Sequence, residues 1–142
     1  MNGRRISLSL ITLLMASGLV LWGCSGPTAY QMDPGQRTAS SEGEMLVEYD
    51  SNGNMAVQMS VAHLPPPSRL EEGMSTFVVW LQPEGASGFY NMGQLRIGDD
   101  RSGSINFTTP FEAFVVRVTA EASATAMSPS DQEVLRRGIG MD

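Results

Sequence analysis

The feature that most constrains the fold is a series of short apolar runs separated by turn residues. The series begins at residue 44. In residues 57–61 apolar and polar side chains alternate, the two-residue period of a half-buried strand. Asn52-Gly53 before this run favours a tight hairpin turn. Prolines 65–67 after it cannot donate to a β-ladder and therefore end it.

Further runs of the same kind follow, and one of them, residues 76–81, is apolar on both faces, as in a central strand. The pattern lacks an amphipathic helix and predicts an all-β, immunoglobulin-like antiparallel sandwich of about seven strands. These strands are expected at 45–49, 57–61, 76–81, 89–97, 105–107, 114–119 and 134–135. Residues 131–137 could instead form one helical turn, and the sequence leaves both readings open.

Trp80 is the residue expected to organise the core. Trp80 and Val78 share one face of their strand, while Phe77, Val79 and Leu81 share the other. Because tryptophan buries the largest apolar area, we predict that Trp80 and Val78 face the core between the sheets. Arg117 is then expected on an outer face.

Residues 1–23 have the layout of an export signal. Two arginines at positions 4 and 5 precede residues 6–22, which carry no charge, and the small Gly23 comes just before Cys24. Leu21-x-Gly23-Cys24 resembles the cleavage site of bacterial lipoproteins, where a small residue admits the backbone to the peptidase. The bulky Trp22 departs from that pattern. The alternative is an uncleaved membrane anchor, because the apolar run is about as long as the shortest helix that can span a membrane.

The lipoprotein resemblance implies that Cys24 becomes the first mature residue. Its sulfur would carry diacylglycerol and its new amino group an acyl chain, and two or more chains hold a protein stably on a membrane. The expected partner is thus the membrane, through lipid on Cys24, and the expected location is extracytoplasmic. Ser25 is compatible with the outer membrane of a diderm bacterium, facing the periplasm or the surface.

The remaining chain divides by composition. Residues 25–43 are rich in Gly, Pro, Ser and Thr without apolar periodicity, which is typical of a segment that cannot bury enough surface to fold. We therefore expect a signal peptide at 1–23, a lipidated cysteine and flexible tether at 24–43, the sandwich at 44–138 and a tail at 139–142.

Charge excludes some classes of partner. Nine basic residues, all Arg, stand against fifteen acidic ones, and removing residues 1–23 leaves seven against fifteen, a charge of −8. This disfavours nucleic acid and a polybasic contact with anionic lipid, both of which need cationic surface. With Cys24 as the single cysteine, neither an intrachain disulfide nor a cysteine-based zinc site can form.

Three local patterns carry a family resemblance. Residues 77–80 read Phe-Val-Val-Trp, 92–95 read Met-Gly-Gln-Leu, and 118–121 read Val-Thr-Ala-Glu, with Pro129-Ser130 beyond. In this order they resemble the extracytoplasmic C-terminal domain of anti-sigma-K-type factors over about residues 55–138. The resemblance implies an immunoglobulin-like sandwich that senses or binds something outside the cytoplasm. The cytoplasmic sigma-binding segment of those factors has no counterpart here, so sigma binding does not carry over.

Copper is the sharpest candidate chemistry. Met55, Met59 and His63 recur every four residues and would share one face of a strand, and thioether and imidazole ligands suit Cu(I). The same face carries Val57 and Val61, so a buried core face is the simpler interpretation. An eight-residue span in a strand is also about 26 Å, too long for one ion.

The other candidates are weaker. His63 could form a Ser-His-Asp arrangement with Ser60 or Ser68, but an exposed or partly packed histidine at a strand edge is the simpler interpretation. Glu71-Glu72 and Asp99-Asp100 are typical of solvated turns. The calcium-loop pattern that begins at Asp50 fails where it needs Gly and Glu, at positions 55 and 61. We therefore predict no catalytic residue, enzyme activity or cofactor. The expected role is a lipid-anchored envelope interaction or structural module that binds an envelope protein, and the alternative is a periplasmic copper-handling protein.

Overall fold

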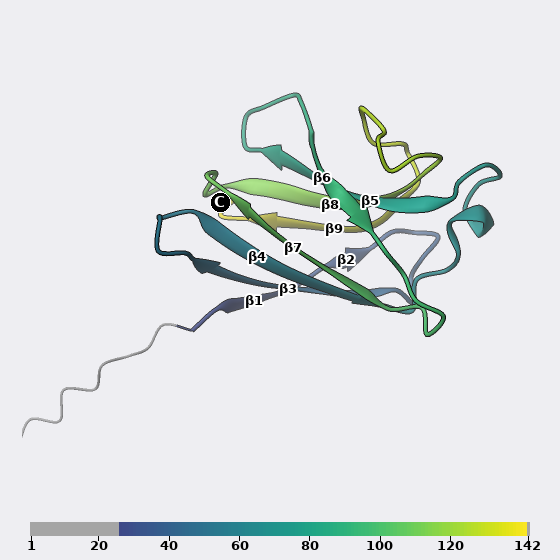
Figure 1. The fold of residues 1–142 in the computed structure, drawn as a ribbon, viewed down its shortest axis with the longest axis horizontal. Coiled ribbons are helices and arrows are strands. Elements are labelled where there is room, and N and C mark those ends of the chain that lie inside the picture. The colour runs from purple at the N-terminus through teal and green to yellow at the C-terminus, as the bar shows by residue number, and fades with distance from the viewer. Residues whose placement is uncertain (1–25, 142) are drawn as a thin grey trace, which may run out of the picture.

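A computed structural model describes residues 26–141, which form two packed antiparallel sheets (Figure 1). One sheet has four strands in the order β1-β3-β4-β7, and the other has five in the order β2-β9-β8-β5-β6. The strands are β1 Thr28–Gln31, β2 Asp33–Pro34, β3 Glu42–Tyr49, β4 Met55–Ala62, β5 Thr76–Pro83, β6 Tyr90–Leu95, β7 Gly103–Thr109, β8 Phe114–Glu121 and β9 Glu133–Ile139, with one 3-10 turn, η1 Pro67–Arg69.

The predicted all-β, immunoglobulin-like sandwich is confirmed at the level of its architecture. Each predicted run lies within or overlaps an observed strand, and Gly53 adopts a φ of 80° in the β3–β4 hairpin, the conformation that such a turn requires. The helical alternative for residues 131–137 is wrong, because Glu133–Ile139 is strand β9, paired with β8. Residues 26–141 hold nine strands rather than about seven.

The main core lies between the sheets. β3 and β4 contribute alternate residues, among them Met45, Val57 and Met59, and the five-stranded sheet contributes Phe77, Phe114 and Leu135. Within residues 26–141, no helix is long and apolar enough to cross a membrane.

The two additional strands overturn the predicted tether. β1 pairs with β3, and β2 pairs with β9, so the chain passes from one sheet to the other at Met32, which is only 5% exposed. The Thr38 hydroxyl donates to the Val134 carbonyl at 2.9 Å, and Ser41 is also buried. The sandwich therefore begins near residue 28, not 44. The polar composition misled us because these hydroxyls bond to backbone carbonyls inside the fold.

The other end of the predicted domain also shifts slightly. Ile139 belongs to β9 and is buried, so the C-terminal tail begins at Gly140 rather than at residue 139. The predicted signal at 1–23 and the lipidated Cys24 lie outside the described residues.

Trp80 is fully buried, but the face assignment was wrong. Phe77, Val79 and Leu81 face the core between the sheets, whereas Val78 and Trp80 lie on the outer face of the five-stranded sheet. Because this strand is apolar on both faces, its sequence shows no alternation that would distinguish the core face from the outer face. The outer face is apolar here because another part of the chain covers it.

The β8–β9 connection, residues 122–132, lies over this outer face (Figure 1). The Trp80 indole N–H donates to the Thr119 hydroxyl at 2.8 Å, and that hydroxyl donates to the buried Glu121 carboxylate. The same carboxylate accepts the Ser130 backbone N–H at 2.7 Å. From β6, the Asn91 amide donates to two carbonyls of the connection, at 3.0 and 3.1 Å. Hydrogen bonds thus hold the connection against the sheet.

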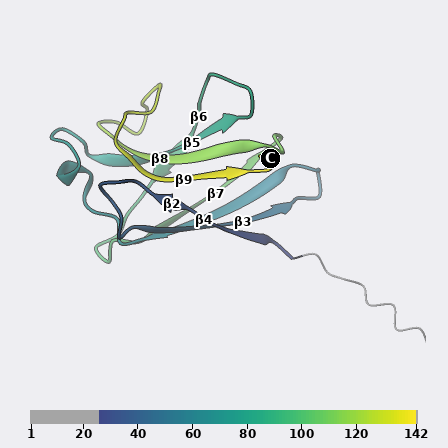
Figure 2. The same cartoon turned by 180° about the vertical axis from the view of Figure 1, so that it is seen from behind.

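The sandwich has two distinct ends (Figures 1 and 2). We call the N-terminal end the one where β1 begins; it comprises the connections 50–54, 84–89 and 110–113 and residues 140–141. The distal end comprises connections 35–41, 63–75 and 96–102 and the points where 122–132 leaves β8 and enters β9.

Candidate functional site

A cleft of about 480 Å³ opens at the distal end of the sandwich. Its apolar floor includes Leu64, Phe77 and Leu95, each about 1% exposed. One side of the cleft is lined by prolines 65–67, the last of which begins η1. The other side is lined by residues 94–99, at the end of β6 and in the turn that follows it. Prolines have few conformations to lose, so this wall is already ordered before any ligand binds.

The rim is fixed by two residues with left-handed backbone conformations. His63 has a φ of 60° and Arg101 a φ of 64°, values that cost free energy for any residue other than glycine. The two are tied together: the Arg101 guanidinium donates to the carbonyls of His63 at 2.8 Å and Leu64 at 3.0 Å. In return, the Leu64 N–H donates to the Arg101 carbonyl at 3.2 Å. Strain of this kind persists where surrounding contacts impose it, and it clusters at binding sites.

The turn that carries Arg101 is itself tightly bonded. Asp100 accepts hydrogen bonds from the backbone N–H and the hydroxyl of Ser102. Both bonds lower the pKa of Asp100 below its ordinary value, and the bond from the hydroxyl has the larger effect. Gly103 is required where the turn enters β7, because a Cβ there would lie 2.2 Å from the Arg96 carbonyl oxygen. The sequence pattern predicted this turn, but it did not predict the cleft.

The cleft combines an apolar floor with a polar, mainly cationic rim. Arg96, Arg101 and Asp99 all line it and are exposed, and Gln94 on the wall donates to Thr76 at 2.9 Å. Such a site suits an apolar side chain or short segment whose flanking carbonyl or carboxylate groups reach the guanidinium groups. Of the hydroxyl groups in the lining, that of Ser75 donates to the Ala122 carbonyl at 2.9 Å.

The predicted copper residues do not meet. Met55 and Met59 point into the core between the sheets, where Met59 is 1% exposed. His63 follows the end of β4 and is exposed, and its backbone carbonyl accepts a hydrogen bond from Arg101, which lines the distal cleft. Within residues 26–141, no group of three His, Cys, Asp or Glu side chains could hold a metal ion. The core interpretation of the two methionines is confirmed.

The weaker candidates are all found in turns or on exposed strand positions. Asp50 accepts the N–H groups of Asn52 at 2.8 Å and Asn54 at 2.9 Å, so the resemblance to a calcium loop reflects a hairpin turn. The backbone hydrogen bond from Asn54 is the main cause of a lowered pKa for Asp50. The pairs 71–72 and 99–100 are exposed, as are the serines at 60 and 68.

No protein-family model and no curated protein matches the chain. The resemblance to anti-sigma-K-type factors therefore stays a prediction. The strands that carry it, β5, β6 and β8, lie side by side in the five-stranded sheet. Sequence reasoning missed the distal cleft, and the only available signal was the Pro-Pro-Pro segment after a strand end.

Proposed function

We propose that the chain is a lipid-anchored, extracytoplasmic β-sandwich without enzyme activity, which binds an envelope protein through the distal cleft. The sequence supports the anchor through Leu21-x-Gly23-Cys24 and the uncharged run before it. The observation that carries the binding role is the position of the cleft, at the end of the sandwich opposite the start of β1.

This arrangement suits an anchored binding protein. A lipid on Cys24 would hold the N-terminal end close to the membrane, so the distal end would face away from it. His63 and Arg101 already hold the rim in a fixed conformation. The cleft therefore does not have to become ordered when a partner binds, which lowers the entropic cost of binding. The negative charge of the mature chain supports a protein partner rather than nucleic acid.

The anchor is tested by growing cells with labelled fatty acid. The wild-type chain should incorporate label, while Cys24→Ala should not, and the mutant should accumulate as the longer precursor. Ser25→Ala, next to the cysteine, is the matched control and should be labelled like the wild type. Equal labelling of the Cys24→Ala protein would contradict lipidation at this residue.

The cleft is tested by crosslinking in intact cells. A photoreactive amino acid at Asp99, on the rim, should give a discrete adduct with an envelope protein, and the adduct should decrease when Arg96→Asp is added. The control position is Gln58, exposed on the outer face of the four-stranded sheet. The binding role fails if position 99 gives no adduct, or gives only the adducts that position 58 gives.

A further inference from the structure

We infer that the N-terminal end of the sandwich rests directly on the headgroups of a zwitterionic lipid bilayer, with Tyr49 and Tyr90 as its membrane-contacting side chains. This inference rests on the proposed lipid anchor at Cys24. It adds a second membrane contact, made by the folded domain itself, to the one made by the lipid.

The first step is the short distance between the lipid and the fold. Thr28, the first residue of β1, pairs with Val47, so Gly26 two positions earlier is level with Tyr49, and both line one hollow of about 330 Å³. From Gly26 back to Cys24 a fully extended chain covers at most about 7 Å. The β3–β4 hairpin continues past Tyr49 through residues 50–54. The chain between the fold and Cys24 is therefore too short to hold the hairpin well away from a lipid on that cysteine.

The headgroup layer of a bilayer is thin compared with the folded domain. Each layer is roughly 5–7 Å thick, taken from a 30 Å hydrocarbon core within a 40–45 Å bilayer. Because diacylglycerol fixes Cys24 at the edge of the hydrocarbon, a separation of a few ångströms places the N-terminal end within or against the headgroups. The long tether expected from the sequence would have allowed the domain to stand clear, but β1 and β2 remove most of it.

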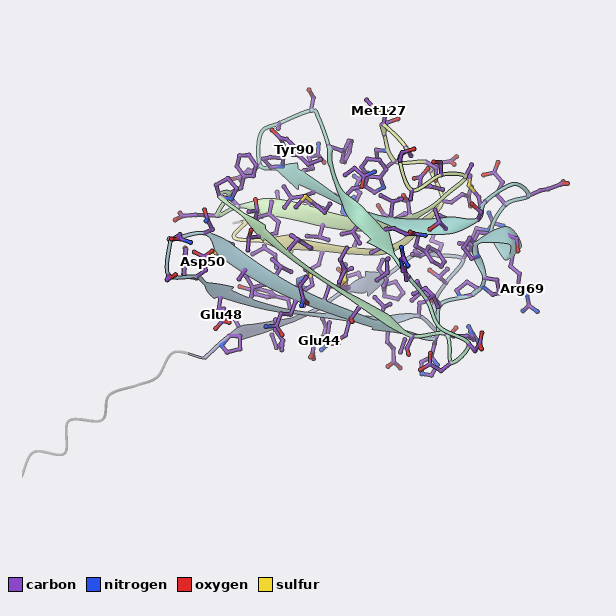
Figure 3. The ribbon with its side chains drawn as sticks, in the orientation of Figure 1. Glu44, Glu48, Asp50, Arg69, Tyr90 and Met127 are labelled. Atoms are coloured by element: carbon purple, nitrogen blue, oxygen red, sulfur yellow. The ribbon has the colours of Figure 1, made fainter. Side chains whose placement is uncertain are left out.

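The second step is the aromatic character of this end. Tyr49 is 60% exposed at the end of β3, and Tyr90 is 54% exposed at the start of β6. The Tyr90 ring lies 5.8 Å from that of Phe111, which is partly buried, and Figure 3 shows Tyr90 on the side of the molecule away from Arg69 in η1. Met141, 45% exposed, adds an apolar side chain. Tyrosine is enriched at membrane interfaces because its ring is apolar and its hydroxyl is hydrated.

The third step is charge, which selects the kind of lipid. Glu48, Glu84 and Glu112 are exposed at this end, and Asp50 is in the hairpin. The Tyr49 hydroxyl lies 3.4 Å from the Glu112 carboxylate. These carboxylates repel anionic headgroups and tolerate zwitterionic ones. The contact should therefore weaken when anionic lipid is added at low salt and recover as salt screens the repulsion.

The test uses the full lipidated protein in phosphatidylcholine vesicles. Ser51→Cys, in the hairpin, and Ser68→Cys, in η1 at the distal end, are exposed and matched in chemistry. A nitroxide on each reports collisions with oxygen, which concentrates in the bilayer, and with a water-soluble nickel chelate. We expect the oxygen-to-nickel ratio to be several-fold higher at position 51 than at 68. It should fall in Tyr49→Ser/Tyr90→Ser but not in Arg69→Ser, whose side chain is exposed in η1 at the distal end.

Two results would overturn the inference: equal ratios at 51 and 68, or spin–spin broadening at position 51, which would mean that a second copy covers this end. Failure of the anchor itself is separately visible. If Cys24 carried no lipid, the wild-type protein, with no introduced cysteine, would take up the nitroxide at its single thiol.

Discussion

The two outer faces of the sandwich differ more than its two sheets do. The outer face of the four-stranded sheet is open and polar; Glu44 and Glu48 of β3 point away from the other sheet in Figure 3. On the outer face of the five-stranded sheet, Val78 and Trp80 are fully buried beneath the connection 122–132 and its hydrogen bonds. The difference shows that a long connection can add a second, smaller core outside the one between the sheets.

Trp80→Ala gives the largest expected difference between the faces. Removing a fully buried indole should lower the free energy of unfolding by about 3–5 kcal/mol, a large share of the stability of a small domain. Chemical denaturation of an unlipidated chain starting at Gly26 measures the loss. Gln58→Ala, on the open face, should stay within about 0.5 kcal/mol of the wild type. Comparable losses in both variants would mean that the faces do not differ.

Glu121→Ala sharpens the comparison at a single carboxylate. The side chain is 5% exposed and accepts hydrogen bonds from Thr119 and the Ser130 N–H, so its loss should cost about 1–3 kcal/mol and loosen residues 122–132. Hydrogen exchange of the Ser130 amide should speed up accordingly. Glu44→Ala, which removes only an exposed hydrogen bond from Gln31, should be near neutral. An unchanged Ser130 exchange rate would show that another contact holds the connection.

Arg117→Ala should have the smallest effect on the covered face. The guanidinium lies 5.2 Å from the Phe89 ring centre, and its Nε lies 3.3 Å from the Glu133 carboxylate. Both groups of the ion pair are partly exposed, so the loss should be about 0.5–1 kcal/mol. Arg136→Ala, the same charge change at an exposed position of β9, should cost less. If Arg117→Ala lowered the free energy of unfolding as much as Trp80→Ala, the small core would depend on the arginine rather than on the tryptophan.

The strands differ in how far the sequence predicts them. β4 was predictable because its residues alternate, one set in the core and the other in water, and the Asn52-Gly53 turn fixes the hairpin before it. β5 was predictable as a strand but not in its orientation, because both of its faces are buried. β1 and β2 escaped prediction because polar hydroxyls and one methionine hold them rather than a periodic apolar face.

The candidate site was less predictable than the fold. The distal cleft depends on the backbone conformations of His63 and Arg101, and a positive φ is uncommon for both residue types, although histidine adopts it more often than arginine does. It also depends on a hydrogen bond between two residues that are 38 positions apart in the sequence, from Arg101 to the His63 carbonyl. His63 was singled out for its ring, whereas its carbonyl is the group that shapes the site.

We propose that the mature protein begins at a lipid-bearing Cys24, close to the folded domain. Intact mass spectrometry of the protein extracted from membranes tests it most directly. We expect the mass of residues 24–142 plus diacylglycerol and an acyl chain, with the modification mapped to the N-terminal peptide. A mass that retains residues 1–23, or an unmodified thiol at Cys24, would contradict it.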